Sequence, residues 1–405
     1  MDNALLRLFE KRFPPAKKTP FRVFDALFFI GITLVAIFVR ALVFDIQSMD
    51  YLDFLTEWYN AIAAAPGFSA LGLSVGNYNV PYLYLMKLMT LLPLGSLYAI
   101  KLFSCLFDFA AGAVMARVIW KQFHSVPYAL GAYALTLFAP TVVLNGAAWA
   151  QCDIIYSFFL LCCVGAFLKN RPLLAAVMFG VAFSFKLQAV FLLPLLVWMW
   201  LARRIRMVHF LAIPAVYFLS LIPAWIAGRP LGELLTIYID QTNTYNQQLS
   251  LNYPNPYTFF GNRYTDLLST AGVMFAIGFV GLILYFMYAT KATPTPNLIV
   301  TFSLFSAMAL PFLLPHMHDR YGFAADVLVL LYVLLRPKRY PALLGFTVIS
   351  LAAYGPYLFG VEPLKLEYVA VGYLFCLGYV GADLVAQCLP EKDKPKEAAI
   401  IRRRA

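Results

Sequence analysis

The chain has 405 residues, of which 62% are hydrophobic and only 13% are charged, and its formal net charge is +11. Soluble domains are about half apolar and about a quarter charged, so this composition excludes a soluble enzyme and a disordered protein. The basic residues form small clusters between long apolar runs. This pattern excludes a nucleic-acid binder and is typical of a polytopic membrane protein.

Twelve apolar segments are predicted to be membrane-spanning helices, so the predicted fold class is all-α, a polytopic transmembrane bundle. The first segment is too long for the core of a cleaved signal peptide. The stretch 81–93 is apolar but too short to span and is predicted to lie in the interface. The predicted spans are 23–44, 97–119, 127–146, 153–169, 172–185, 187–202, 208–227, 265–290, 297–314, 321–336, 341–359 and 368–389.

The positions of lysine and arginine predict the orientation of these spans. With the N-terminus in the cytoplasm, 23 of the 31 basic residues fall in the cytoplasmic tails and turns, as the positive-inside rule requires. We therefore expect a multi-pass cell-membrane protein with both termini in the cytoplasm. The predicted organisation is a basic cytoplasmic tail (1–22), a single transmembrane domain (23–389) with outer-face loops at 45–96 and 228–264, and a second basic cytoplasmic tail (390–405).

The segment 172–202 is ambiguous, because a single helix there would place the arginines that follow it on the outer side. We divide it at Lys186, which gives two short spans joined by a turn on the outer face. Both halves are shorter than the usual span of about 20 residues, so we expect them to be tilted or partly re-entrant.

With this orientation, the uncommon polar side chains collect at the outer ends of the spans. Ionisable groups at membrane depth usually face a cavity or a partner. We therefore predict one polar pocket that opens to the outer side. Its candidate residues are Asp50, Asp53, Glu57, Tyr78, Asn79, Gln151, Asp153, Lys186, Gln188, His316, His318, Arg320 and Tyr321.

The acidic candidates differ in how strongly they indicate function. Asp50, Asp53 and Glu57 are three and four residues apart, so a helix would place them on one face. For Asp53 and Glu57 a solvated helix face is the simpler interpretation, whereas the extended-looking segment before Asp50 favours a functional role. Two more carboxylates lie within spans: Asp108 is expected to pack against a polar neighbour, and Asp326 could face the pocket.

The basic candidates suit an anionic ligand. Lys186 lies between two apolar runs, so it binds an anion or stays at the outer surface. The guanidinium fork of Arg320 suits a phosphate or a carboxylate. His316 and His318 are interpreted as hydrogen-bonding partners of a phosphate or sugar, or as ordinary loop histidines. No metal site is predicted, because the sequence lacks a second ligand cluster with zinc spacing.

Five motifs, in this order, resemble those of the multi-pass GT-C glycosyltransferases, in particular bacterial relatives of the GPI mannosyltransferase that adds the second mannose. The resemblance covers about residues 25–385. Met49 and Ala150 stand where the family pattern has glycine, and Asp319 stands where it has glutamate, which leaves the role of Asp319 open. The motifs are Ser48-Met-Asp-Tyr51, Asn77-Tyr-Asn-Val-Pro-Tyr82, Trp149-Ala-Gln-Cys-Asp-Ile-Ile-Tyr156, Phe183-Ser-Phe-Lys-Leu-Gln188 and Pro315-His-Met-His-Asp-Arg-Tyr321.

The resemblance implies that a hexose of the mannose or glucose type moves from a polyprenyl-phosphate sugar to a hydroxyl group. The acceptor would be a glycan, a glycolipid or a protein on the non-cytoplasmic face. Single displacement inverts the anomeric carbon and needs a base and charge stabilisation of the leaving phosphate. No cofactor is required, and a divalent cation (Mg²⁺ or Mn²⁺) beside the phosphate is left open.

The same resemblance assigns roles to the candidate residues. Asp50 would be the base. The donor phosphate would be held by Lys186, Arg320, His316 and His318. The sugar or the acceptor would be bound by Asp53, Glu57, Tyr78, Asn79, Gln151, Asp153, Gln188 and Tyr321, although tyrosines at helix ends are also ordinary interface anchors.

Two other classes of function fit the apolar spans. A secondary transporter or a flippase for lipid-linked sugars should carry ionisable groups at the membrane midplane, often in two related halves. Here these groups gather at one leaflet and the halves do not match. A non-catalytic membrane scaffold would leave the charged residues of the outer side without a purpose.

Overall fold

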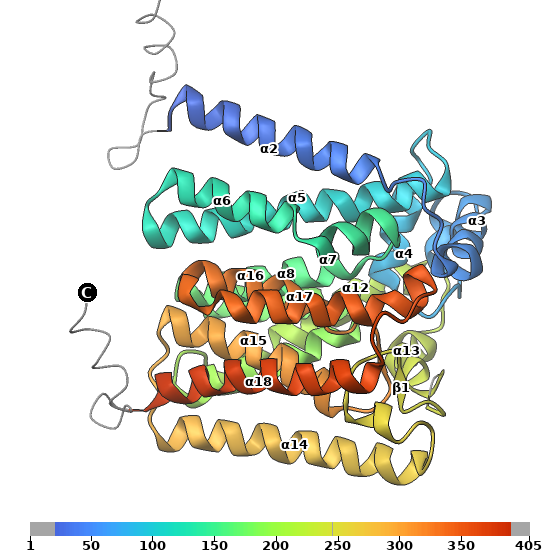
Figure 1. The fold of residues 1–405 in the computed structure, drawn as a ribbon. Helices are drawn as coiled ribbons and strands as arrows, with labels where there is room; N and C mark the ends of the chain where they lie inside the picture. The colour runs from blue at the N-terminus through green and yellow to red at the C-terminus, as the bar shows by residue number, and fades with distance from the viewer. Residues whose placement is uncertain (1–20, 245, 390–405) are drawn as a thin grey trace, which may run out of the picture.

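The computed structural model describes residues 21–244 and 246–389, which are mostly helical. Long apolar helices lie side by side and run from one end of the molecule to the other (Figure 1). Within the described ranges, seven helices are long and apolar enough to cross a membrane. They are α2 (Val23–Ala41), α5 (Ser96–Phe123), α11 with α12 (Met207–Phe210 and Ala212–Ile226), α14 (Thr265–Ala289), α15 (Pro296–Leu313), η6–α17–η7 (Pro337–Phe359) and α18 (Leu366–Cys388).

The remaining predicted spans are shorter or bent. The helix α6 (Val126–Leu137) meets the segment Pro140–Ala148, made of α7 (Pro140–Val143) and η3 (Leu144–Ala148), at 51°, and the bend lies where Pro140 cannot continue the hydrogen-bond ladder. The shorter apolar helices are α8 (Asp153–Leu168), α9 (Pro172–Phe185), η4–α10 (Leu187–Leu201) and α16 (Phe323–Leu335). Every predicted span coincides with one of these elements, which confirms the fold class, whereas the number of segments that cross the membrane stays a prediction.

The predicted division of 172–202 is present in the backbone. Lys186 is extended, with φ −154° and ψ 135°, between the end of α9 and the start of η4. Its carbonyl still accepts from the backbone N–H of Ala189, at 3.2 Å. A helix break at this point brings a lysine side chain out of an otherwise apolar stretch.

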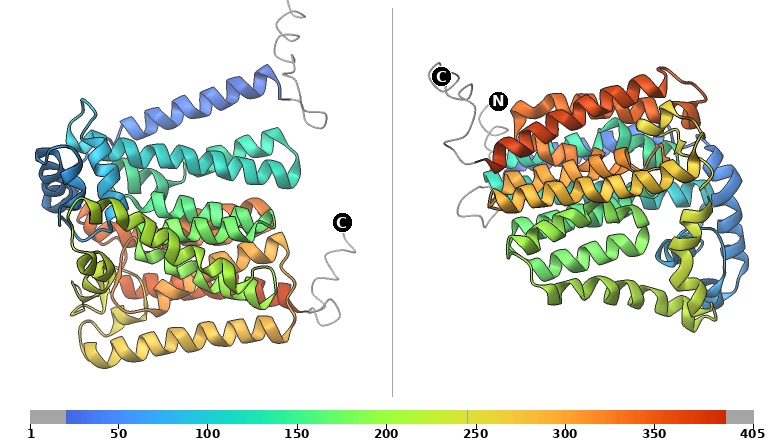
Figure 2. Two further views of the ribbon diagram at one scale, coloured as in Figure 1. Left: turned by 180° about the vertical axis from the view of Figure 1, so that it is seen from behind. Right: turned by 90° about the horizontal axis from the view of Figure 1, so that it is seen from below.

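The short elements gather at one end of the bundle. The loop 45–96 contains η1 (Tyr51–Leu55), α3 (Thr56–Ala64), η2 (Gly67–Gly72) and α4 (Val80–Met89). The loop 228–264 contains a helix that was not predicted, α13 (Leu231–Thr244), then β1 (Ser250–Leu251) and η5 (Pro256–Phe259). Figures 1 and 2 show α3, α4, α13 and β1 at the end of the bundle opposite to the start of α2 and the end of α18.

A small parallel sheet joins two distant loops at this end. In it, β1 pairs with β2 (Met317–His318), and Leu251 stands opposite His318. The backbone N–H of Asp319 donates to the carbonyl of Leu251 at 2.9 Å. The sheet therefore fixes the 315–322 loop, which carries several candidate residues, against the loop before α14.

The centre of the bundle consists of α8, α15 and α16, which are largely buried, whereas α2, α12 and α14 are mostly exposed. Polar residues in the spans pair with one another. The guanidinium of Arg40 lies 2.9 Å from Asp108 and also donates to the carbonyl of Leu137 at 3.1 Å. Asp108 is thus a packing carboxylate, as predicted, and it fastens α2 to its neighbours.

Candidate active site

The position of Asp50 is set by the segment that follows α2. Lys101, which is fully buried in α5, donates to the carbonyls of Val43, Phe44 and Ile46 at 3.3, 2.8 and 2.6 Å. Buried ammonium groups need such partners, because an unpaired charge is costly away from water. The lysine therefore holds the segment that follows α2 and leads to Asp50.

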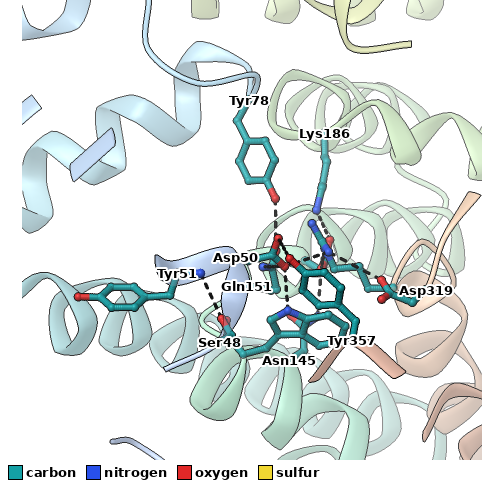
Figure 3. A network of polar contacts seen from close by, with 12 residues as sticks. Ser48, Asp50, Tyr51, Tyr78, Asn145, Gln151, Lys186, Asp319 and Tyr357 are labelled. Atoms are coloured by element: carbon teal, nitrogen blue, oxygen red, sulfur yellow. Dashed lines mark hydrogen bonds and ion pairs between the residues drawn. The ribbon is translucent and has the colours of Figure 1, made fainter. Parts of the chain in front are cut away.

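A serine continues this support up to Asp50. The hydroxyl of Ser48 donates to the carbonyl of Trp149 at 2.7 Å and accepts from the backbone N–H of Tyr51 at 3.2 Å. These contacts join the start of η1 to the turn before α8. Asp50 lies between Ser48 and Tyr51 in the chain, so the two contacts hold the backbone around it (Figure 3).

Asp50 is buried and accepts hydrogen bonds from four side chains. The indole of Trp149 and the amide of Gln151 each donate to Oδ2 at 2.8 Å, and Arg320 donates to the same oxygen at 3.1 Å. The hydroxyl of Tyr357 donates to Oδ1 at 3.3 Å. Donors from separate parts of the chain thus fix the orientation of this carboxyl group.

The Trp149 and Gln151 side chains both reach Asp50 because the backbone between them is left-handed. Ala150 has φ +64°, and the N–H of Gln151 donates to the carbonyl of Asn145 at 2.9 Å. Only glycine adopts this conformation at little cost. Ala150 therefore replaces the glycine of the family pattern at a position where the backbone conformation favours glycine.

This backbone conformation gives a prediction for position 150. Ala150→Gly should change the free energy of unfolding by less than about 1 kcal/mol, because relief of the left-handed strain offsets the loss of one buried methyl group. Ala150→Val should destabilise the protein by about 2 kcal/mol or more, because a β-branched residue is strained at this φ. Detergent-based unfolding of the two variants measures the difference, and equal stability of both would contradict the assignment.

A second buried ion pair lies beside Asp50. Asp153, the first residue of α8, is ion-paired with Lys186 and accepts from the side-chain amide of Asn145 at 3.0 Å. The ammonium of Lys186 also lies 5.1 Å from the centre of the Tyr78 ring, a favourable cation–π position. The extended backbone at Lys186 thus delivers a cation to the N-terminus of α8.

Arg320 is shared by three carboxylates. Its guanidinium lies 3.1 Å from Asp50, 3.7 Å from Asp153 and 3.7 Å from Asp319, and it lies 5.6 Å from the centre of the Trp149 indole ring. Its Nε has no hydrogen-bond partner among the described residues. The arginine therefore keeps a donor for a further anionic or polar group.

These groups open into a polar cavity of about 420 Å³. The predicted residues that line it are Asp50, Asp53, Tyr78, Gln151, Lys186, His318, Arg320 and Tyr321. Asp153 lies beneath them, paired with Lys186 and Arg320. Asp319, whose role was left open, also lines the cavity, as do Trp58, Gln241, Asn252 and Tyr357, which were not predicted. The role of Trp149 as a donor to Asp50 was not predicted either.

Glu57 and Asn79, both predicted site residues, lie away from this cavity for clear structural reasons. Glu57 is exposed in α3 and does not line the cavity, although its neighbour Trp58 does, so the predicted carboxylate face does not extend to Glu57. Asn79 caps α4 by accepting from the N–H of Val80 at 2.9 Å, and it donates to the carbonyl of Ser184 at 2.9 Å. The geometry gives neither residue a contact with a ligand in the cavity.

The two histidines diverge instead of acting together. His316 has φ +61°, which breaks the alternation of the strand, and its ring contacts Ser269 at 2.9 Å and the carbonyl of Gln248 at 2.7 Å. His318 lines the polar cavity. Burial, reinforced by Arg320 and Lys186, lowers the pKa of His318 to about 3, so its imidazole is neutral at physiological pH.

A second, largely apolar cavity of about 300 Å³ adjoins the first. His316 and Gln188 belong to this cavity rather than to the polar one. The two cavities share Gln241, His318 and Tyr321. Apolar side chains supply most of the remaining surface, including Leu187, Val190, Phe191, Val273, Leu314 and Pro315.

Two further features describe the chemistry of the site. Within the described part of the chain, no group of three or more His, Cys, Asp or Glu side chains is arranged to hold a metal ion. Asp326, which the sequence analysis placed near the pocket, is buried in α16 and does not line it. The reason is that α16 carries it into the packed centre of the bundle.

Comparison with known proteins shows a similarity of structure but not of sequence. No protein-family model and no curated protein matches the sequence. Among solved structures, ArnT from Cupriavidus metallidurans, determined bound to undecaprenyl phosphate, superimposes with a TM-score of 0.53 at 13% sequence identity. The match covers 90% of this chain and 77% of ArnT. The chain therefore shares the polytopic helical fold of ArnT and is built as a multi-pass membrane protein.

Proposed function

We propose that this protein is a membrane glycosyltransferase that moves a hexose from a polyprenyl-phosphate sugar to an acceptor hydroxyl. The observation that carries this proposal is the junction of the two cavities. The polar one offers cations and hydrogen-bond donors, and the adjoining one is apolar. A lipid-linked phosphosugar has this same division between a charged, hydroxylated head and a hydrocarbon chain.

The cations of the polar cavity suit the donor phosphate. Lys186 and Arg320 both line it, and the Nε–H of Arg320 has no hydrogen-bond partner among the described residues. His318 is neutral and supplies hydrogen bonding rather than charge. ArnT, whose fold this chain shares, was determined with undecaprenyl phosphate, a carrier lipid of the kind that the proposed donor would release.

In the proposed reaction, the acceptor oxygen attacks the anomeric carbon and the bond from that carbon to the phosphate oxygen breaks. The acceptor proton passes to Asp50, and the bonding electrons leave with the polyprenyl phosphate. Because there is one displacement, the anomeric configuration inverts. Asp53, Tyr78, Gln151 and Tyr321, which line the same cavity, are placed to bind the hexose or the acceptor.

We further propose that the cavity lies at the non-cytoplasmic face and that the hexose is of the mannose or glucose type. The basic residues favour this orientation by the positive-inside rule. The GPI-mannosyltransferase resemblance of the five motifs supports the sugar class. The acceptor is a glycan, a glycolipid or a protein.

The direct test is transfer by the purified protein from a radiolabelled undecaprenyl-phosphate hexose. We expect label in the acceptor, an equal amount of undecaprenyl phosphate, and the opposite anomeric configuration. Failure with both mannose and glucose donors over a panel of glycan, glycolipid and peptide acceptors would overturn the proposal. Movement of intact donor across proteoliposomes would assign transport instead.

A further inference from the structure

The loop that carries Arg320 places a second carboxyl group in the polar cavity. Asp319 lines the cavity, is 5% exposed, and has its Oδ1 3.7 Å from the Arg320 guanidinium. This oxygen has no hydrogen-bond partner among the described residues. Asp50, in contrast, accepts four hydrogen bonds. The two carboxyl groups thus lie on one arginine in different environments.

Three carboxyl groups and two cations surround the site, so its net charge is zero only if one carboxyl group is neutral. Asp50, Asp153 and Asp319 surround Arg320, and Lys186 supplies the second positive charge. Two of these carboxylates offset the two cations. A third negative charge would be uncompensated, and the phosphate of the donor would add another.

The surroundings of the three carboxyl groups indicate which one is neutral. Asp50 and Asp153 accept hydrogen bonds or form ion pairs through their oxygens, whereas Oδ1 of Asp319 has no hydrogen-bond partner among the described residues. Burial raises the pKa of Asp319 to about 7, opposed by Arg320 and increased further by Asp50 and Asp153.

Acid and base roles follow when neighbouring carboxyl groups have environments that separate their protonation states. We propose that Asp319 is the general acid of the transfer and gives its proton to the leaving polyprenyl phosphate, while Asp50 takes the proton of the acceptor hydroxyl. This inference rests on the proposed function. It adds a catalytic residue that the motif comparison left open.

The proposed step balances in atoms and charge. The acceptor O–H bond breaks and Asp50 becomes protonated; the bond between the anomeric carbon and the phosphate oxygen breaks and that electron pair leaves with the phosphate. The phosphate then takes the Asp319 proton and departs as a monoanion. The charge of the two carboxyl groups together is unchanged, so the site gains no net charge during the reaction.

The kinetic test compares wild type, Asp319→Asn and Asp319→Glu. For wild type we expect kcat/KM to fall as pH rises through about 7, because the acid must be protonated. Asp319→Asn should lower kcat about 10²-fold and abolish the decline of kcat/KM at alkaline pH. Asp319→Glu should recover part of kcat and show the alkaline decline again. An unchanged pH profile in Asp319→Asn would overturn the assignment. Glu362→Gln, an exposed residue outside the site, is the control.

A change of leaving group separates acid catalysis from simple positioning of Arg320. A polyprenyl phosphorothioate donor releases a less basic anion, which has less need of a proton. We expect Asp319→Asn to slow this donor by a much smaller factor than the phosphate donor. Equal slowing of both donors would show a positioning role and refute the general acid.

A third measurement does not depend on turnover, so it distinguishes failure of this inference from failure of the proposed function. Infrared difference spectra of the full chain between about pH 5 and pH 9 should show a protonated-carboxyl band that titrates near neutrality and is missing in Asp319→Asn. A wild-type spectrum without this band would contradict the neutral Asp319, even if transfer is observed. If the band is present but the protein transfers no hexose, Asp319 is protonated as inferred, but the proposed function fails and the general-acid role fails with it.

Discussion

Asp50→Asn is expected to lower the rate of hexose transfer by about 10³-fold, within the range found when a general base is removed. The asparagine keeps the shape of the side chain but cannot take a proton. It also removes the negative charge that orients Arg320 and accepts hydrogen bonds from the Trp149 indole and the Gln151 amide. We therefore expect the loss to appear in kcat rather than in donor affinity.

The measurement is steady-state transfer from the labelled donor, with Asp45→Asn as the matched control. Asp45 lies in the same segment but is exposed and accepts a hydrogen bond from Tyr98 outside the cavity. Its variant should retain nearly full activity. More than about a tenth of the wild-type rate in Asp50→Asn would remove the base assignment.

Lys186→Met is expected to destabilise the protein by about 3–5 kcal/mol, because it leaves a buried carboxylate without its ion-pair partner. Lys186 and Asp153 are 4% and 1% exposed. Asn145 and the more distant Arg320 cannot replace the lost ammonium. The effect should be seen as a lower midpoint of unfolding in detergent.

A double variant separates the structural role of this pair from its role in catalysis. Lys186→Met combined with Asp153→Asn removes both charges and should recover most of the stability. It should remain inactive, since the donor phosphate loses a cation. Lys365→Met, an exposed lysine outside the site, is the control. A single variant as stable as wild type would contradict the buried-pair description, and an active double variant would contradict the phosphate role of Lys186.

The sequence predicts the spans well because long apolar runs leave few alternatives in a membrane. It also predicts the break at Lys186, since a lysine between two apolar runs and the arginines after them constrain the direction of the chain. The co-location of Asp50, Gln151, Lys186 and Arg320 follows from placing the ends of the spans at one face.

Other parts of the site depend on packing that a pattern does not encode. Tyr357 reaches Asp50 from η7 across 307 residues of sequence, and no local signal gives the rotation of that helix. His316 turns away because its φ is positive, a conformation that only a few per cent of non-glycine residues adopt and that no local pattern predicts. The helix α13 was missed because its sequence is mixed, with polar residues and a glycine in place of a long apolar run.

The wide separation of the Asp50 partners also affects how the protein is synthesised. The donors to this carboxylate are 99 to 307 residues further along the chain, so Asp50 leaves the ribosome long before Arg320 or Tyr357 exists. A nascent chain that ends before residue 320 contains the aspartate without its arginine. Under the proposed function, a product that ends before residue 320 is catalytically silent, because its Asp50 lacks the arginine partner.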